Sequence, residues 1–247
     1  MTTFSNLPVT IIGASRGLGR TIAETFHRQG AQVLVTARGQ ADLDAVAREL
    51  PGTRTLACDA ADAGTPAKVF AVQAPRLLIL CGGAIPPCRP LPDMDWEAFS
   101  INWNIDVQMS FVFLQAVLKH ALPAGTTVVT IASGAAINGS PVSGGYAGAK
   151  RMQILMSGYA QKEADRAGLE LRFLAVSPGR IMPQADVGKA GVAGYAAYNG
   201  ITEAAFVESM GPPLTLQTVA DAVADLAGDG ASSGHFLVSP DGVSALN

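Results

Sequence analysis

Charged residues are scarce in this chain of 247 residues. They make up 15% of the sequence, hydrophobic residues make up 49%, and the formal net charge is -3. So small a charge offers no electrostatic footprint for nucleic acid or for an anionic membrane. A chain of this length buries a sizeable core, but it has few charges to solvate its surface. We therefore expect part of that surface to be covered in a homodimer or homotetramer.

Cysteine and histidine are also rare, with three residues of each. Cys58, Cys81 and Cys88 cannot all pair and form no C-x-x-C motif, so we interpret them as free thiols in a reducing cytoplasm. The histidines lie far apart, and no group of histidine, cysteine and carboxylate residues has ligand spacing. The sequence therefore predicts no metal site.

Long apolar runs are absent as well. No run reaches the length of a membrane span, and the first ten residues, MTTFSNLPVT, contain no basic region followed by an apolar core. We therefore expect a cytoplasmic protein with neither a membrane span nor a secretory signal.

Short apolar segments do occur, and they alternate with segments of helical periodicity. The predicted strands are residues 7–12, 31–37, 53–58, 76–80, 126–132, 169–176 and 235–239. The predicted helices follow the first strand, cover residues 42–50, 95–122 and 216–227, and include one that carries Tyr146 and Lys150. This alternation favours an α/β fold: one domain over residues 1–247, with a Rossmann-type, doubly wound parallel sheet of about seven strands and helices on both faces.

The ends of the predicted strands mark the place where a ligand is expected. In doubly wound sheets, ligands bind at the carboxyl ends of the strands. Six positions follow predicted strands and should meet at that edge: Gly13, Arg38, Asp59, Cys81, Ser133 and Pro178.

The segment GASRGLG, from Gly13 to Gly19, lies between the first predicted strand and the first predicted helix. Glycines there permit a tight turn, and the start of the helix offers free N–H groups to a diphosphate. An ordinary glycine-rich turn is the alternative, but the placement favours nucleotide binding.

Arginines stand where the two nicotinamide dinucleotides are distinguished. Folds that bind NAD usually carry an acidic residue at the end of the second strand, whereas a 2'-phosphate needs arginine. Arg38 occupies this position, and Arg16 lies in the glycine-rich segment. Both residues suit a phosphate and favour NADP over NAD, unless they are merely solvated surface residues.

Tyr146 and Lys150 are four residues apart, so on a helix they share one face. An ammonium beside a phenol favours the phenolate, which makes the tyrosine a usable acid and base. Ser133 ends a predicted strand and can bond the same substrate oxygen as the tyrosine. The alternative is a half-buried ring beside a solvated amine.

Together these motifs resemble the short-chain dehydrogenase/reductase family in its NADP-preferring form, over essentially the whole chain. The resemblance rests on GASRGLG, Asp59, Ser133, Tyr146, Lys150, Pro178-Gly179 and the PDG of residues 240–242. It implies that Tyr146 donates a proton to a carbonyl, that Ser133 holds the carbonyl oxygen, and that Lys150 assists the tyrosine and binds the nicotinamide ribose. It further implies an NADP(H) site composed of Gly13, Ser15, Arg16, Gly17, Leu18, Gly19, Arg38, Asp59, Gly82, Gly83, Tyr146, Lys150, Pro178, Gly179 and Ile181.

Three positions depart from the family pattern. The NNAG motif of the family is replaced by residues 81–84, Cys-Gly-Gly-Ala, which lack both side-chain amides. The family's catalytic asparagine falls on Asp106, with Asn104 two positions away. Aspartate cannot donate as an amide does, although it can hold a water in a proton relay. A threonine that bonds the cofactor carboxamide is replaced by Pro183.

The resemblance implies an enzyme that reduces a ketone or aldehyde to an alcohol with NADPH, or runs the reverse reaction. The alternatives are a C=N or C=C reductase and, because of the three departures, an NADP(H)-binding sensor or scaffold. Residues 183–213 would form a substrate lid. Its expected apolar lining is Met182, Tyr195, Tyr198, Phe206 and Met210, with Lys189 and Glu203 as polar contacts.

Overall fold

The structure is a computed structural model that describes residues 4–120 and 122–246. Its strands form one sheet in the order β3-β2-β1-β4-β5-β6-β7-β8. Pairing is parallel from β3 to β7, whereas β8 is antiparallel to β7. The strands are β1 Pro8–Ile12, β2 Gln32–Ala37, β3 Arg54–Ala57, β4 Leu77–Leu80, β5 Thr126–Ile131, β6 Leu171–Pro178, β7 Gly234–Ser239 and β8 Gly242–Leu246.

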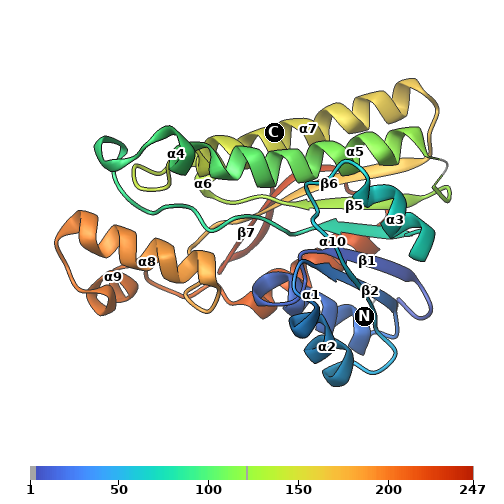
Figure 1. Cartoon of the computed structure of the whole chain (residues 1–247), viewed down its shortest axis with the longest axis horizontal. Helices are drawn as coiled ribbons and strands as arrows, with labels where there is room; N and C mark the ends of the chain where they lie inside the picture. Colours follow the sequence, from blue (N-terminus) through green and yellow to red (C-terminus); the bar gives the residue numbers. More distant parts are fainter. Residues whose placement is uncertain (1–3, 121, 247) are drawn as a thin grey trace.

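Helices cover both faces of the sheet (Figure 1). One face carries α1 Gly17–Arg28, α2 Gln40–Glu49 and α10 Leu216–Gly228. The other face carries α3 Thr65–Val72, α5 Gln108–Lys119 and α7 Tyr146–Arg166. The remaining helical segments are η1 Leu91–Asp93, α4 Trp96–Asn102, η2 Trp103–Val107, α6 Ala135–Asn138, α8 Asp186–Asn199 and α9 Glu203–Ser209.

The burial of β4 explains why the strands are continuous apolar runs in the sequence. Successive strand residues point to opposite faces. Leu77 and Ile79 accordingly join the core cluster under α1 and α10, while Leu78 and Leu80 join the cluster under α5 and α7. A strand buried on both faces needs apolar residues at every position. The predicted α/β Rossmann-type sheet is thereby confirmed.

The chain changes direction across the sheet between β1 and β4. Gly13 follows β1 with φ +80°, and a Cβ there would lie 2.4 Å from Gly82 Cα, which follows β4. A side chain at residue 13 would therefore both strain the turn and collide with the neighbouring backbone. This close approach lies at the topological switch point, where ligands of doubly wound sheets bind.

Several elements were not predicted. The sequence analysis overlooked α3, α6 and the antiparallel edge strand β8, which follows β7 through the PDG turn. The long segment after residue 183, expected as a lid without assigned elements, contains the two helices α8 and α9. Helix α8 is rich in glycine and alanine. It therefore has few large apolar residues whose spacing would have predicted a helix.

The predicted helix over residues 95–122 is divided into three segments. Asp95 caps α4 by accepting a hydrogen bond from the Ala98 N–H, 2.7 Å away. The following segment, η2, is π-helical, and α5 then continues to Lys119. His120 is extended, and Ala121 lies outside the described residues, so the helix is shorter than predicted.

Two findings bear on the composition. Cys58, Cys81 and Cys88 are free. Within residues 4–120 and 122–246, no helix combines the length and the apolar character that crossing a membrane requires.

Candidate active site

A cleft of about 1010 Å³ runs along the carboxyl ends of the strands. All six positions that follow predicted strands line it, from Gly13 and Arg38 to Ser133 and Pro178. The same cleft is lined by each remaining residue of the predicted site: Ser15, Arg16, Gly17, Leu18, Gly19, Asp59, Gly82, Gly83, Asp106, Tyr146, Lys150, Gly179 and Ile181. The topology therefore brings the nucleotide motif and the serine, tyrosine and lysine into one cavity.

The glycine-rich turn leads directly into the N-terminus of helix α1. Arg16 is the N-cap of α1, and among the residues that the structure describes no side chain caps the first turn of that helix. No acidic residue lies in this turn. Gly19 is also required, because a Cβ there would lie 2.3 Å from the Gly13 carbonyl oxygen. The free N–H groups and the positive end of the helix fit an anionic diphosphate.

Arg16 and Arg38 are both exposed at this end of the cleft. Arg16 Nη1 lies 3.3 Å from Asp186 Oδ2 at the start of α8, with side chains that are 67% and 40% exposed. An ion pair so exposed contributes little stability and is easily exchanged for another anion. Asp59 accepts a hydrogen bond from the Ala61 N–H at 3.0 Å, which fixes the loop after β3.

Ser133 and Tyr146 come from opposite ends of one loop. Ser133 follows β5, and its Oγ accepts a hydrogen bond from the Ala135 N–H at 3.2 Å, so its own O–H remains able to donate. Tyr146 is the first residue of α7. The preceding Gly145 packs so closely that a Cβ would lie 2.3 Å from the Phe99 carbonyl oxygen, which anchors the start of α7 against α4.

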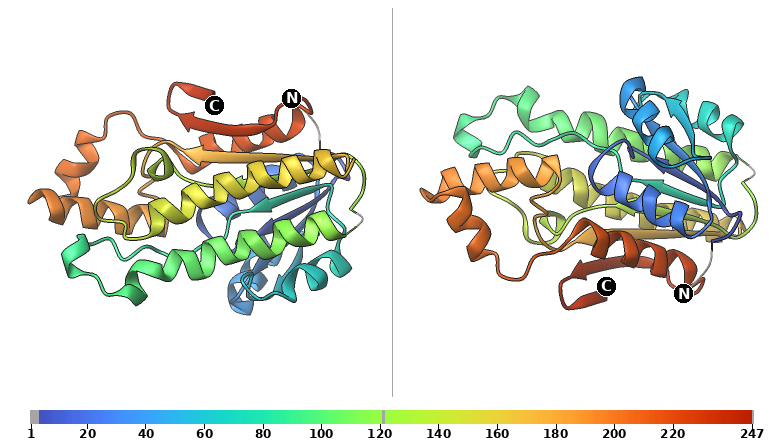
Figure 2. Two further views of the ribbon diagram at one scale, coloured as in Figure 1. Left: turned by 90° about the horizontal axis from the view of Figure 1, so that it is seen from above. Right: turned by 90° about the horizontal axis from the view of Figure 1, so that it is seen from below.

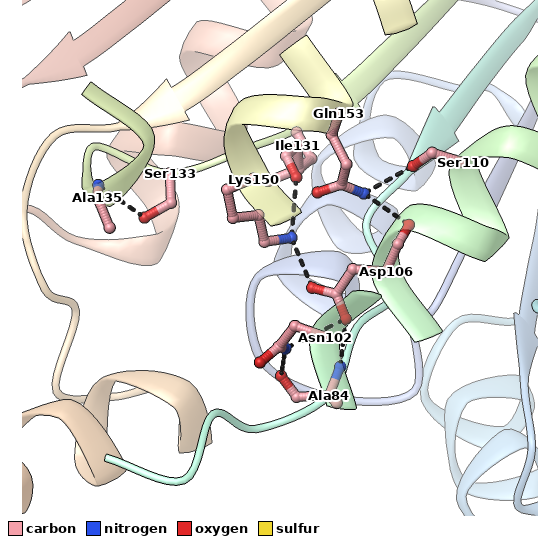
Figure 3. Close-up of polar contacts among 9 residues, drawn as sticks. All are labelled: Ala84, Asn102, Asp106, Ser110, Ile131, Ser133, Ala135, Lys150 and Gln153. Carbon is pink, nitrogen blue, oxygen red and sulfur yellow. Dashed lines mark hydrogen bonds and ion pairs between the residues drawn. The ribbon is translucent and has the colours of Figure 1, made fainter. Parts of the chain in front are cut away.

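Lys150 is buried one turn after Tyr146, and its Nζ lies 5.5 Å from the centroid of the tyrosine ring. The ammonium donates to the Ile131 carbonyl at 3.4 Å and pairs with Asp106 Oδ2 at 3.1 Å (Figure 3). The alternative of a solvated amine is thus excluded, since Lys150 is buried at the base of the cleft.

Comparison with known proteins identifies the family of the chain. A family model described as enoyl-(acyl carrier protein) reductase matches residues 13–241. The chain belongs to the short-chain dehydrogenase/reductase family.

Three curated relatives of the same family match part of the chain. L-xylulose reductase of Bos taurus is 30% identical over 133 residues, 52% of this chain and 54% of the relative. Carbonyl reductase (NADPH) 2 of Sus scrofa is 26% identical over 53% of this chain and 54% of the relative. D-threitol dehydrogenase of Mycolicibacterium smegmatis is 31% identical over 51% of this chain and 52% of the relative. The match spans about half the length of each of these relatives.

Solved structures match over nearly the whole length. A short-chain dehydrogenase/reductase from Brucella melitensis, described as glucose/ribitol dehydrogenase, has a TM-score of 0.75 at 22% identity, covering 96% of both chains. A 3-ketoacyl-(acyl-carrier-protein) reductase from the same organism, complexed with NADH, has a TM-score of 0.79 at 18% identity, covering 94% of this chain and 96% of that chain. At these identities the likeness shows the fold.

Neighbouring residues hold the loop of residues 81–84, which in this chain replaces the NNAG motif of the short-chain dehydrogenase/reductase family. Asp106 Oδ1 accepts a hydrogen bond from the Ala84 N–H at 2.8 Å. Asn102 donates to the Ala84 carbonyl at 2.9 Å and to Asp106 Oδ1 at 3.3 Å (Figure 3). These contacts hold the peptide of Ala84 from both sides. They fix the loop after β4, which in this chain carries no side-chain amide at residues 81–84.

The π-helical segment η2 determines which residue reaches this position. Asp106 is fully buried and lines the cleft, whereas Asn104 is exposed, lies outside the cleft lining and donates to Ser100 Oγ at 3.4 Å. Of the two candidates for the family's asparagine position, the structure places Asp106 in the cleft and Asn104 outside it. Pro183 also lies outside the cleft lining, beside a smaller hollow on the lid.

Gln153 was missed by the sequence analysis. Its amide Nε2 donates to the Asp106 backbone carbonyl at 3.1 Å and to Ser110 Oγ at 2.6 Å, so it ties α7 to η2 and α5. The available signal was an uncharged amide three residues after Lys150, on the same helix face and within an apolar run.

The lid supplies most of the expected apolar lining. Met182, Tyr195, Phe206 and Met210 line the cleft. The Tyr195 and Phe206 rings are stacked with centroids 5.5 Å apart, and the Tyr195 hydroxyl donates to Ser140 Oγ at 2.7 Å. Those contacts connect the lid to the loop between Ser133 and Tyr146.

Three lid residues lie elsewhere than predicted. Tyr198 was expected to line the cleft, but it is 52% exposed, because α8 extends past the cleft and ends one residue later. Lys189 pairs with Asp186, and with Glu203 it borders the smaller hollow on the lid.

Asn102→Ala is expected to lower the free energy of unfolding by about 1–3 kcal/mol, because it leaves the Ala84 carbonyl without its buried donor. Asn104→Ala is the matched control, and its effect should stay within about 0.5 kcal/mol because the side chain is exposed. Urea unfolding of the three proteins measures both values. Equal losses in the two variants would contradict a bracing role for Asn102.

Proposed function

We propose that this protein is an NADPH-dependent oxidoreductase that reduces a ketone or aldehyde to an alcohol. The observation that carries the proposal is the shared cleft, in which Ser133, Tyr146 and Lys150 lie together with the glycine-rich turn at the start of α1. The buried lysine, 5.5 Å from the tyrosine ring, supports an acid and base role for Tyr146.

Each residue would have a separate role at the carbonyl group. The Tyr146 hydroxyl would donate the proton to the carbonyl oxygen, and the Ser133 hydroxyl would hold that oxygen with a second hydrogen bond. Lys150 would assist the tyrosine and hold the nicotinamide ribose. When bound, the dinucleotide supplies the hydride. The chain itself contributes positioning, proton supply and the exclusion of water by the lid.

The preference for NADPH rests on charge. Arg38 at the end of β2 and Arg16 in the turn present two guanidinium groups where a ribose 2'-phosphate would lie. The printed name of the pig relative specifies NADPH, whereas the fold neighbour from Brucella was complexed with NADH. The residues of this chain favour the former.

The substrate end of the cleft combines apolar and hydroxyl groups. Met182, Phe206 and Met210 line it together with Ser140 and Asn138. Curated relatives are named for xylulose, erythrulose and threitol. We therefore propose an uncharged carbonyl compound with both hydroxyl and apolar parts as the substrate class.

Three other functions remain as test outcomes. A C=C reductase is favoured by the description of the matching family model, and a C=N reductase would use the same fold. An NADP(H)-binding sensor is favoured by the replaced family motif at residues 81–84. NADPH oxidation over panels of carbonyl, enoyl and imine compounds separates them, since binding without turnover on any panel indicates a sensor.

Tyr146→Phe is expected to lower kcat/KM for carbonyl reduction by at least about 100-fold, because the proton donor is lost. NADPH binding, measured by fluorescence, should remain. Tyr159→Phe is the matched control, since this exposed tyrosine lies on the same helix outside the cleft and should leave activity unchanged. Wild-type activity in the Tyr146→Phe protein would refute the proposed role.

Arg38→Ala is expected to weaken NADPH binding by about tenfold or more, because a charged hydrogen bond to the 2'-phosphate is lost, while NADH binding changes little. Arg48→Ala, which removes an exposed arginine outside the cleft lining, is the control. Isothermal titration of each protein with both dinucleotides measures the ratio. A wild-type protein that binds NADH as tightly as NADPH would contradict the preference.

We also propose a homo-oligomer formed through α5 and α7, which lie side by side on one face of the sheet (Figure 2). Three apolar residues of these two helices are exposed: Phe111 53%, Tyr159 53% and Leu155 38%. Others, including Phe113, Met156 and Ala160, are buried in the core instead. The exposed residues form the apolar patch that a second subunit would cover.

Phe111→Lys is expected to dissociate the oligomer, because it places a charge within the apolar patch. Light scattering after size exclusion should give a dimeric or tetrameric mass for the wild-type protein and a smaller mass for the variant. Ile201→Lys, at an exposed position on the lid, is the matched control. A monomeric wild-type mass would refute this interface.

A further inference from the structure

The most deeply buried charges of the cleft belong to Asp106 and Lys150. Their side chains are 1% and 8% exposed, and Lys150 Nζ lies 3.1 Å from Asp106 Oδ2. The same ammonium lies 5.5 Å from the Tyr146 ring centroid. Figure 3 shows the lysine pointing toward Asp106 and the Ile131 carbonyl. One buried ammonium therefore serves a carboxylate and a phenol at the same time.

The ionisable groups around Lys150 come from three elements. They are Asp106 on η2, Tyr146 on α7 and Cys81 after β4. Burial raises the pKa of the Cys81 thiol to about 12, so this group stays neutral. Strand β5 contributes the Ile131 carbonyl, and the adjacent Gln153 is uncharged. The local charge balance is therefore set by the carboxylate, the ammonium and the phenol.

We infer that Asp106 is the buried counter-ion of Lys150, and that this balanced pair keeps Tyr146 in its protonated form, which sets the site for carbonyl reduction. The inference rests on the proposed function of Tyr146. An ammonium without a counter-ion would stabilise the phenolate, whereas an adjacent carboxylate cancels much of that effect. Because Asp106 acts through Lys150, it is a positioning residue.

The charge state of the lysine agrees with this assignment. Burial opposes the ammonium, but Asp106 and then Tyr146 together outweigh burial and raise the pKa of Lys150. The lysine consequently remains charged at neutral and mildly alkaline pH. Asp106 is itself held in place by the Ala84 N–H at 2.8 Å and, through its backbone carbonyl, by Gln153 at 3.1 Å.

With the carboxylate of Asp106 replaced by an amide, the phenolate of Tyr146 becomes the anion available to balance Lys150. The phenolate would then form at lower pH. Carbonyl reduction needs the protonated phenol and would be lost at a correspondingly lower pH.

The test is the pH dependence of kcat/KM for NADPH-dependent carbonyl reduction in the wild-type protein and in Asp106→Asn. The alkaline limb of the variant is expected to lie about one pH unit or more below that of the wild type. Glu163→Gln is the charge-matched control, since it removes an exposed carboxylate from α7, the helix that carries Lys150.

The alkaline limb of Glu163→Gln should coincide with the wild-type limb. If the alkaline limb of Asp106→Asn does not move, or moves to higher pH, Asp106 is not the counter-ion that we infer. An equal displacement in Glu163→Gln leads to the same conclusion, since it would show a general effect of removing a carboxylate.

A second measurement needs no substrate. Tyrosinate formation is followed by ultraviolet difference absorbance, and subtracting the trace of the matching Tyr146→Phe protein isolates the signal of Tyr146. The signal should appear at lower pH in Asp106→Asn than in the wild type. If this shift occurs but no carbonyl compound is reduced, the proposed function fails and the counter-ion stands. If carbonyl compounds are reduced but the tyrosinate signal does not shift, the proposed function stands and the counter-ion role of Asp106 is overturned.

Stability provides a third measurement in case a single variant does not fold. Lys150→Met and Asp106→Asn each leave one buried charge without its partner, whereas the double variant removes both charges. The double variant should have a higher Tm than Lys150→Met. A folded double variant beside an unfolded single variant supports the pair. A double variant no more stable than either single variant overturns it.

Discussion

The buried pair of Lys150 and Asp106 is the interaction to which the rest of the chemical site is fixed. Charges removed from water are stable only when they are paired and when their remaining polar atoms are satisfied. Asp106 meets this condition with the Ala84 peptide on one side and the lysine on the other. The pair thereby joins the loop after β4, the segment η2 and the helix α7. Replacing one member alters three parts of the chain together.

The opposite end of the cleft is constructed differently. There the backbone provides most of the recognition, through the glycine-rich turn and the uncapped start of α1. The ends of β1 and β4 approach so closely at Gly13 and Gly82 that no side chain fits at residue 13. One cavity thus combines a backbone site suited to a diphosphate with a side-chain site suited to proton transfer. The parallel sheet makes this combination possible because all of these segments leave it at the same edge.

The strands and the residues that follow them could be predicted from the sequence, because a strand buried on both faces must be apolar throughout. The spacing of Tyr146 and Lys150 identified a shared helix face for the same kind of local reason. Asn102 and Gln153 could not be identified, since their partners lie up to 47 positions away and depend on a π-helical turn. Tyr198 was assigned wrongly because composition alone does not show where a helix leaves a cleft.

The π-helical segment η2 has a consequence for how this chain tolerates change in length. A π turn contains an extra residue compared with an α turn, and each residue of an α-helix rotates the chain by about 100°. Shortening this segment by one residue would allow α4 and α5 to merge into one continuous helix. Every side chain before the deletion would then rotate away from its partner, including Asn102 from Ala84. The architecture of the cleft is therefore encoded in the length of this helix as well as in the chemistry of its residues.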